Sequence, residues 1–208
     1  MSVAIDGRAT SAEGSLLDAV LAAGIDLPHL CKDDNLPAIG ACRTCLVEAD
    51  GRIVAACSLP AEGVSSVDTQ SERVRRIRRS VLELTAGMQE AGSEGTAGGP
   101  LAAAAHLAYA REGADVARFA TATGSQIDVS SPFFAFHEDQ CILCGRCVVA
   151  CQALQHIGAI GLAREGGATR VTPGAGVPFN DSTCTACGSC VAACPTTALR
   201  PKEGPTDG

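Results

Sequence analysis

Cysteine is the residue type with the clearest chemical pattern in this 208-residue sequence, because twelve cysteines fall into three groups of four. The first group is spaced C-x10-C-x2-C-x11-C, and the other two are both spaced C-x2-C-x2-C-x3-C. Four thiolates are the usual ligand set of an iron–sulfur cluster. No cysteine is left over for a disulfide or a catalytic thiol. The groups are Cys31, Cys42, Cys45 and Cys57; Cys141, Cys144, Cys147 and Cys151; and Cys184, Cys187, Cys190 and Cys194.

The first group predicts a [2Fe–2S] cluster. Cys42 and Cys45 lie on one short loop, where both thiolates can bind the same iron, and the two distant cysteines complete the set. Residues 40–44 are mostly small, so backbone N–H groups can approach the sulfides and raise the reduction potential. A four-cysteine zinc site is the alternative. Zinc sites usually have two closely spaced pairs, however, and this group has only one.

The second and third groups form an internal repeat with a period of 43 residues. Their spacing is that of bacterial proteins with two [4Fe–4S] clusters, in which the fourth cysteine of each repeat binds the cluster of the other repeat. We therefore expect twelve iron-binding cysteines in three sets, two of them crossed. The crossed sets are Cys141, Cys144, Cys147 and Cys194 for one cluster, and Cys184, Cys187, Cys190 and Cys151 for the other.

The elements around the first group indicate a small α+β domain over residues 1–70. Two hairpins are predicted, over Val3–Thr10 and Cys45–Ala55, because an Asp-Gly turn interrupts each strand pair. A capping-box pattern starts a helix at Ser15, and Gly24 ends it. Residues Val64–Asp68 are predicted to add a last strand at the edge of the sheet.

Residues 71–132 are predicted to link this domain to a second one over 133–208, which contains both repeats. A helix over 71–88 is expected to bury Val74, Ile77, Val81 and Leu84. Its arginines are expected to form a solvated face, or alternatively a docking surface for an acidic partner: Arg73, Arg75, Arg76, Arg78 and Arg79. Residues 89–100 resemble a flexible linker, and a second helix is predicted over 101–119.

Composition supports metal sites in a protein of the cytoplasm. Aromatic residues make up only 3% of the chain, so large core-filling side chains are scarce. Metal ligation can supply the folding free energy that the missing hydrophobic burial does not. The net charge of −7 argues against nucleic acid as a partner. No secretory signal is recognised at the N-terminus, and no apolar run approaches the roughly 20 residues needed to cross a bilayer.

These motifs resemble the N-terminal electron-transfer region of the large iron–sulfur subunit of complex I. Similar regions occur in α subunits of NAD-linked molybdenum or tungsten formate dehydrogenases, in diaphorase subunits of NAD-linked hydrogenases and in [FeFe] hydrogenases. The similar segments are Pro28–Cys31, Gly40–Glu48, Ala56–Ser58 and the two repeats, and Phe134–Cys147 is most similar to the formate dehydrogenase branch. The resemblance implies a β-grasp [2Fe–2S] ferredoxin domain, a helical linker and a two-[4Fe–4S] domain similar to bacterial ferredoxins.

Two departures from the family pattern alter what the resemblance implies. Most members carry a further cluster held by an H-x3-C-x2-C-x5-C motif, but no cysteine lies between Cys57 and Cys141. If His106 were that histidine, the cysteine positions would hold Ala110, Gly113 and Phe119, so we expect this cluster to be absent. The sequence also ends at Gly208 without the molybdenum module of the formate dehydrogenase α subunits.

The expected function is therefore electron relay. No dinucleotide-binding motif or flavin site is recognised, so we do not expect catalysis by this chain alone. The implied partners are a flavin/NAD(H)-binding diaphorase-type subunit and a separate metal-dependent catalytic subunit. A molybdenum or tungsten formate dehydrogenase is the first candidate and a nickel hydrogenase the second. A free ferredoxin-like carrier is the alternative of a different class.

Overall fold

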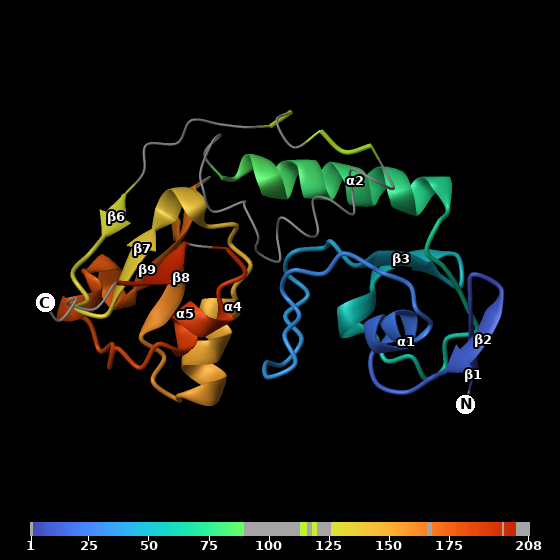
Figure 1. Cartoon of the computed structure of the whole chain (residues 1–208), viewed down its shortest axis with the longest axis horizontal. Coiled ribbons are helices and arrows are strands. Elements are labelled where there is room, and N and C mark those ends of the chain that lie inside the picture. The colour runs from blue at the N-terminus through green and yellow to red at the C-terminus, as the bar shows by residue number, and fades with distance from the viewer. Residues whose placement is uncertain are drawn as a thin grey trace, which may run out of the picture.

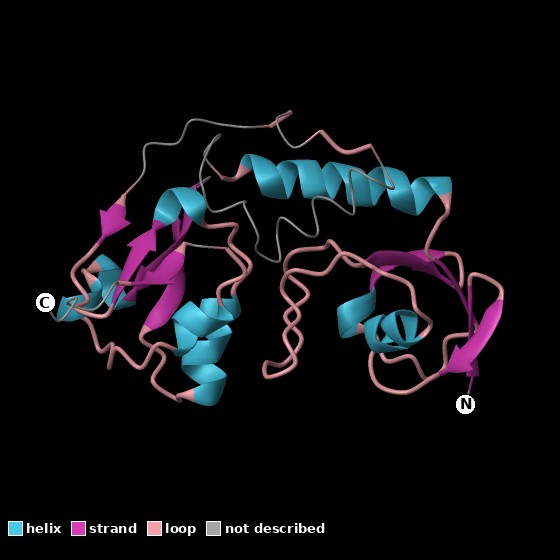
Figure 2. Ribbon diagram, viewed as in Figure 1, coloured by secondary structure: helices cyan, strands magenta, loops and turns pink. Residues whose placement is uncertain are grey.

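The chain folds as two lobes connected by the long helix α2, Glu72–Gly87 (Figure 1). This computed structural model describes residues 2–89, 113–115, 118–119, 126–165, 168–196 and 198–202. We name residues 2–68 the N-terminal lobe and residues 126–202 the C-terminal lobe. Figure 2 shows strands and short helices in both lobes, with long loops between them. None of the described helices is long and apolar enough to span a membrane.

The N-terminal lobe is built on a five-stranded sheet with the order β2-β1-β5-β3-β4. Both predicted hairpins are present as antiparallel pairs. The prediction of an edge strand at the end of this lobe is wrong, because β5 is central, parallel to β1 and antiparallel to β3. Each hairpin has one inner edge of unpaired backbone groups, and a strand between the hairpins satisfies both edges. The strands are β1 Ser2–Ile5, β2 Arg8–Ser11, β3 Leu46–Ala49, β4 Arg52–Ala55 and β5 Ser66–Asp68.

Helix α1, Leu16–Ala22, packs its buried face against this sheet. The predicted capping box is present: the Asp18 backbone N–H donates to Ser15 Oγ (3.2 Å), and the Ser15 backbone N–H donates to the Asp18 carboxylate (2.9 Å). Gly24 follows the helix with φ of +77°, a left-handed conformation that favours glycine. Local sequence is therefore sufficient to define both ends of this helix.

Helix α2 begins after Ser71, whose Oγ accepts a hydrogen bond from the Val74 backbone N–H (3.2 Å). Val74 and Leu82 are buried on it, whereas Leu84, predicted to be in the core, is 54% exposed. The buried face follows residues four apart, and it therefore passes through an arginine position that the sequence analysis placed on the solvated side.

Arg78 is that position, and its side chain is only 2% exposed. Its guanidinium donates to the backbone carbonyls of Leu46 and Thr69, both at 3.1 Å. A buried carbonyl without a donor is costly, so this arginine connects α2 to the sheet by satisfying two of them. The prediction of a wholly solvated arginine face is wrong at this residue, while Arg73 and Arg76 are exposed.

The predicted linker and second helix lie mostly outside the described residues. Residues 113–115 and 118–119, which are described, are not helical, so the prediction of helix up to residue 119 is wrong there. These residues contact the last turns of α2: the Asp115 backbone N–H and the Arg118 guanidinium both donate to the buried Glu83 carboxylate, at 3.0 and 3.1 Å. His106, Ala110 and the rest of 101–112 lie outside the described residues.

The C-terminal lobe combines a three-stranded sheet, a separate hairpin and two short helices that carry the repeats. The sheet has the order β10-β7-β6, and β6 lies before the expected domain boundary at residue 133. Phe179 contacts Phe134 and Phe136 edge-on, with ring centroids 5.0 and 6.1 Å apart. The elements are β6 Ile127–Asp128, β7 Phe134–His137, α4 Arg146–Val149 with a π turn Ala150–Leu154, β8 Ile160–Glu165, β9 Ala168–Pro173, α5 Ser189–Ala193 and β10 Leu199–Pro201.

Candidate iron–sulfur centres

The first cysteine group lies on the loop after α1 and on the short 3-10 helix Ala56–Ser58. Cys31, Cys45 and Cys57 are at most 2% exposed. The Cys31 backbone N–H donates to Cys42 Sγ at 3.4 Å. Contact with the Cys31 thiol and burial raise the pKa of Cys42. The structure therefore brings the distant cysteine beside the close pair.

Cys57, on the 3-10 helix, is the fourth cysteine of this site. A hydrogen bond with Cys57 is the main cause that lowers the pKa of Cys45. The loop that carries the close pair turns through left-handed backbone at Gly40 and Arg43, with φ of +67° and +56°. A Cβ atom at Gly40 would lie 3.4 Å from Ser58 Oγ, which is an ordinary contact, so the left-handed backbone and not the available space favours glycine at this position. Four thiols around one small-residue loop fit the donor set of a [2Fe–2S] cluster.

The two repeats adopt the same local backbone around their cysteines. Leu143 and Ala186 both have left-handed φ, +52° and +55°, although neither is glycine. The backbone N–H of each donates to the Sγ of the first cysteine in its own repeat, at 3.5 Å in the first and 3.4 Å in the second. Gly145 and Gly188 then open α4 and α5 with φ of +78° and +81°. The sequence repeat is thus also a structural repeat.

The fourth cysteine of each repeat lies near the three cysteines of the other repeat. Cys194 is close enough to raise the pKa of Cys141, Cys144 and Cys147 through charge repulsion, in addition to the larger effect of burial. A small cavity has four cysteines in its wall, among aliphatic and small residues: Cys151, Cys184, Cys187 and Cys190. This set contains three cysteines of the second repeat and the fourth of the first, which is the combination of the second predicted ligand set.

Burial raises the pKa of several of these thiols above the value of an ordinary cysteine. It raises the pKa of Cys141 to about 11 and the pKa of Cys144 and Cys190 to about 12. Cys187 is exposed. Burial is the largest single effect on its pKa and raises it, but several hydrogen bonds, chiefly with Ser189, together lower the pKa below its ordinary value. Metal ligation requires thiolates, so loading these sites must displace protons that burial holds on the sulfur. Sets of four thiolates of this kind fit the ligation of iron–sulfur clusters.

The first group and the first repeat meet at the contact between the two lobes. Arg146 lies between Cys144 and Cys147, and its guanidinium donates to the Leu30 carbonyl at 3.3 Å. It also forms an ion pair with Asp33, just after Cys31. Figure 1 shows the loop after α1 extending from the N-terminal lobe toward α4. The two cysteine sites are therefore joined through a few buried residues.

The sequence analysis did not single out Arg146. Its exposure is only 8%, and it is buried between the lobes. A signal was available, because the second repeat has Ser189 where the first has this arginine. A charged residue that breaks an otherwise close repeat is a candidate for a contact specific to one repeat.

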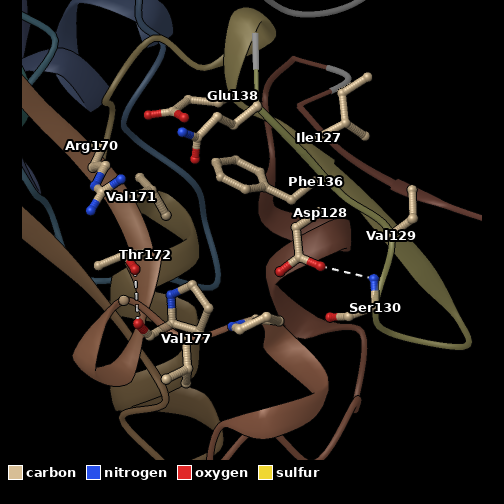
Figure 3. Close-up of a pocket in the computed structure, with 14 residues that line it drawn as sticks. Ile127, Asp128, Val129, Ser130, Phe136, Glu138, Arg170, Val171, Thr172 and Val177 are labelled. Carbon is tan, nitrogen blue, oxygen red and sulfur yellow. Dashed lines mark hydrogen bonds between the residues drawn. The ribbon is translucent and has the colours of Figure 1, made fainter.

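A further hollow in the C-terminal lobe lies between β6–β7 and β9, away from the cysteines. Figure 3 shows Asp128, Phe136 and Arg170 around it. Asp128 has a structural role there, since its carboxylate accepts from the backbone N–H groups of Ser130 (2.8 Å) and Phe179 (2.9 Å). These bonds hold β6 against the segment that precedes the second repeat.

Comparison with known proteins identifies two domains in the chain. Residues 1–72 match the 2Fe-2S iron-sulfur cluster binding domain, and residues 140–198 match the 4Fe-4S dicluster domain. A crystal structure of an NAD+-reducing [NiFe]-hydrogenase contains a chain that is 31% identical, with a TM-score of 0.81. The alignment covers 100% of this chain and 89% of that one. The chain therefore belongs to the family of iron–sulfur proteins that combine a 2Fe-2S domain with a 4Fe-4S dicluster domain and that includes this hydrogenase chain.

The curated relatives include proteins named as a formate dehydrogenase and as subunits of NADPH- and NADH-dependent oxidoreductases. The Bacillus subtilis protein "Putative formate dehydrogenase YrhE" is 34% identical over 97% of this chain, and the NADPH-Fe(3+) oxidoreductase subunit alpha of Geobacter sulfurreducens is 32% identical over 86%. The mitochondrial NADH-ubiquinone oxidoreductase 78 kDa subunit of Candida albicans is 35% identical over 40% of this chain and 12% of its own length. The chain spans about a fifth of the length of the first two. The predicted family and the α+β class are confirmed, and the chain is an iron–sulfur electron-transfer protein of the kind found in NAD-linked oxidoreductases.

Proposed function

We propose that the chain relays single electrons through one [2Fe–2S] and two [4Fe–4S] clusters. The [2Fe–2S] ligands are Cys31, Cys42, Cys45 and Cys57. The [4Fe–4S] ligands are Cys141, Cys144, Cys147 and Cys194 in one set, and Cys184, Cys187, Cys190 and Cys151 in the other. The observation that supports the proposal is the proximity of the three cysteine groups. Cys144 belongs to the core of the N-terminal lobe, and Cys194 and Cys151 each lie near cysteines of the other repeat.

The chain's own residues have three tasks in this relay. Bound clusters supply one-electron chemistry over a wide range of potentials. The cysteines hold them as thiolates, and the buried aliphatic residues around the repeats exclude water. Backbone N–H groups that donate to cysteine sulfur, such as those of Cys31, Leu143 and Ala186, tune the potentials upward.

The proposed partners are a flavin/NAD(H)-binding subunit at one end and a metal-dependent catalytic subunit, on a separate chain, at the other. A molybdenum or tungsten formate dehydrogenase is the favoured partner, supported by the 34% identity to the Bacillus subtilis relative over nearly the whole chain. A nickel hydrogenase is the second candidate, supported by the structural similarity over 89% of a hydrogenase chain.

Anaerobic purification from the native host tests this function. We expect the chain to co-purify with a flavoprotein and with a subunit that contains molybdenum or tungsten; nickel would instead support the hydrogenase assignment. A chain that purifies alone, with all its clusters, would be a free ferredoxin-like carrier. Weak redox encounters bury little surface, so a stable complex would exclude that alternative.

Paired serine substitutions test the crossed ligand sets. Cys151→Ser should alter the EPR spectrum of the cluster held by the second repeat, and Cys194→Ser that of the cluster held by the first. Single substitutions Cys144→Ser and Cys187→Ser serve as references for the two spectra. If Cys151→Ser reproduced the spectrum of Cys144→Ser, the ligand sets would not be crossed.

A further inference from the structure

Arg146 places a positive charge beside the cysteines of the first repeat. It lies between Cys144 and Cys147 in the sequence, and all three residues are only 8% exposed. Burial raises the pKa of Cys144 to about 12, whereas the Arg146 backbone N–H and then the charge of its guanidinium act in the opposite direction. Arg146 therefore favours negative charge on the sulfur atoms of this site.

One donor of this guanidinium has no acceptor in the part of the chain that the structure describes. Nη1 donates to the Leu30 carbonyl at 3.3 Å and Nη2 donates to the Asp33 carboxylate, whereas Nε is buried without a hydrogen-bond partner. A buried donor without an acceptor is costly, and native proteins pair nearly all such groups. Sulfur can accept a hydrogen bond, and hydrogen bonds to the sulfurs of a cluster help to set its potential. The donors of Arg146 thus fit a bound cluster as well as the lobe contact.

The second repeat lacks this charge. An offset of 43 residues places Ser189 at the position of Arg146. The Ser189 hydroxyl accepts a hydrogen bond from the Gln155 side chain at 2.8 Å, and the surrounding residues Ser182–Leu199 contain no charged side chain. Because the backbones of the two cysteine loops match, the arginine changes the charge of the first repeat and not its fold.

We propose that the buried positive charge of Arg146 raises the reduction potential of the cluster held by the first repeat, and so sets how readily an electron crosses between the lobes. This inference rests on the relay function proposed above. Uptake of one electron adds one negative charge to the site, and a buried cation attracts that charge more strongly than it would in water. The donor site is oxidised as the acceptor site is reduced, and no bond is made or broken. The carboxylate of Asp33 opposes the effect, because it partly cancels the charge of the guanidinium.

The test is a redox titration of the cluster-loaded chain, followed by EPR, with the spectra assigned through the serine variants described above. Arg146→Gln removes the charge and should shift the redox equilibrium of the first-repeat cluster toward the oxidised form at least about tenfold, which is about 59 mV for one electron. The second-repeat cluster should shift less, because its loop has no arginine. Arg76→Gln, at an exposed position of α2, is the control and should shift neither.

A change at the other end of the ion pair separates an effect of charge from a loosened contact. Asp33→Asn removes the opposing carboxylate and should raise the potential of the first-repeat cluster, although it breaks the same pair as Arg146→Gln. A purely structural role would move the potential in the same direction in both variants. Arg146→Lys keeps the positive charge and should shift the potential less than Arg146→Gln.

Iron content makes each outcome decisive. If the variants keep about ten irons and Arg146→Gln leaves the potential unchanged, or Arg146→Lys shifts it as far, the charge proposal is wrong and the relay function stands. Should Arg146→Gln lose iron, Asp33→Asn decides alone, and an unchanged or lowered potential would overturn the proposal. If the unaltered chain binds no iron–sulfur cluster, both proposals fail.

Discussion

Replacement of Arg146 by serine gives the first repeat the residue of the second and should loosen the contact between the lobes. The side chains of Arg146 and Asp33 are only 10% and 20% exposed. Breaking a fully buried pair costs about 3–5 kcal/mol, because the remaining charge has no partner. Since Asp33 is partly solvated, we discount that range and expect a loss of about 2–3 kcal/mol. The Leu30 carbonyl also loses a donor.

The assay is anaerobic denaturant unfolding of the cluster-loaded chain, with Asp33→Asn and the double variant alongside. The double variant should lose little more than the worse single variant, because either change alone breaks the pair. Arg76→Ser, an exposed arginine of α2, is the control and should cost less than about 0.5 kcal/mol. The reasoning is refuted if Arg146→Ser is as mild as the control, or if Arg146→Ser and Asp33→Asn are additive.

Three further predictions concern stability. Arg78→Leu should cost about 2–4 kcal/mol in denaturant unfolding because two buried carbonyls lose their donor, whereas Arg76→Leu should be nearly neutral. Gly87→Ala should destabilise by about 1–3 kcal/mol, since its Cβ would lie 2.5 Å from a backbone oxygen; Gly161→Ala, with open space around it, should not lower the melting temperature comparably. Burial raises the pKa of Cys144 to about 12, so the folded metal-free chain keeps a proton that the unfolded chain loses above about pH 9. The free energy of unfolding of the metal-free chain should therefore be constant below about pH 9 and fall from about pH 9 to 12. A metal-free chain that is as stable at about pH 11 as at about pH 8 would contradict this.

The parts of the fold that were predictable depend on short-range chemistry. Ser15 and Asp18 form their capping box within one turn, and the two hairpins turn at Asp-Gly pairs. The position of β5 was not predictable in this way, because it depends on two hairpins that are distant in sequence. A strand of only three residues shows too little of its pattern to distinguish a central place from an edge.

The candidate sites show the same division. Spacing alone predicts which cysteines form each ligand set, since a cluster requires four thiolates and the repeat offers a known crossed arrangement, and this assignment stays a prediction. It did not predict the roles of Arg78 and Arg146. In both cases a charged residue is buried because it meets carbonyl or carboxylate groups from distant segments, and no local pattern encodes such a meeting. Charge runs and single arginines therefore look solvated in a sequence until the tertiary contacts are known.

The most direct test of the central claim is the iron and acid-labile sulfide content of the anaerobically purified chain. One [2Fe–2S] and two [4Fe–4S] clusters predict about ten irons and about ten sulfides per chain. About fourteen irons would reveal a further [4Fe–4S] cluster. Zinc in place of iron, or a content of about two irons, would contradict the three-cluster relay.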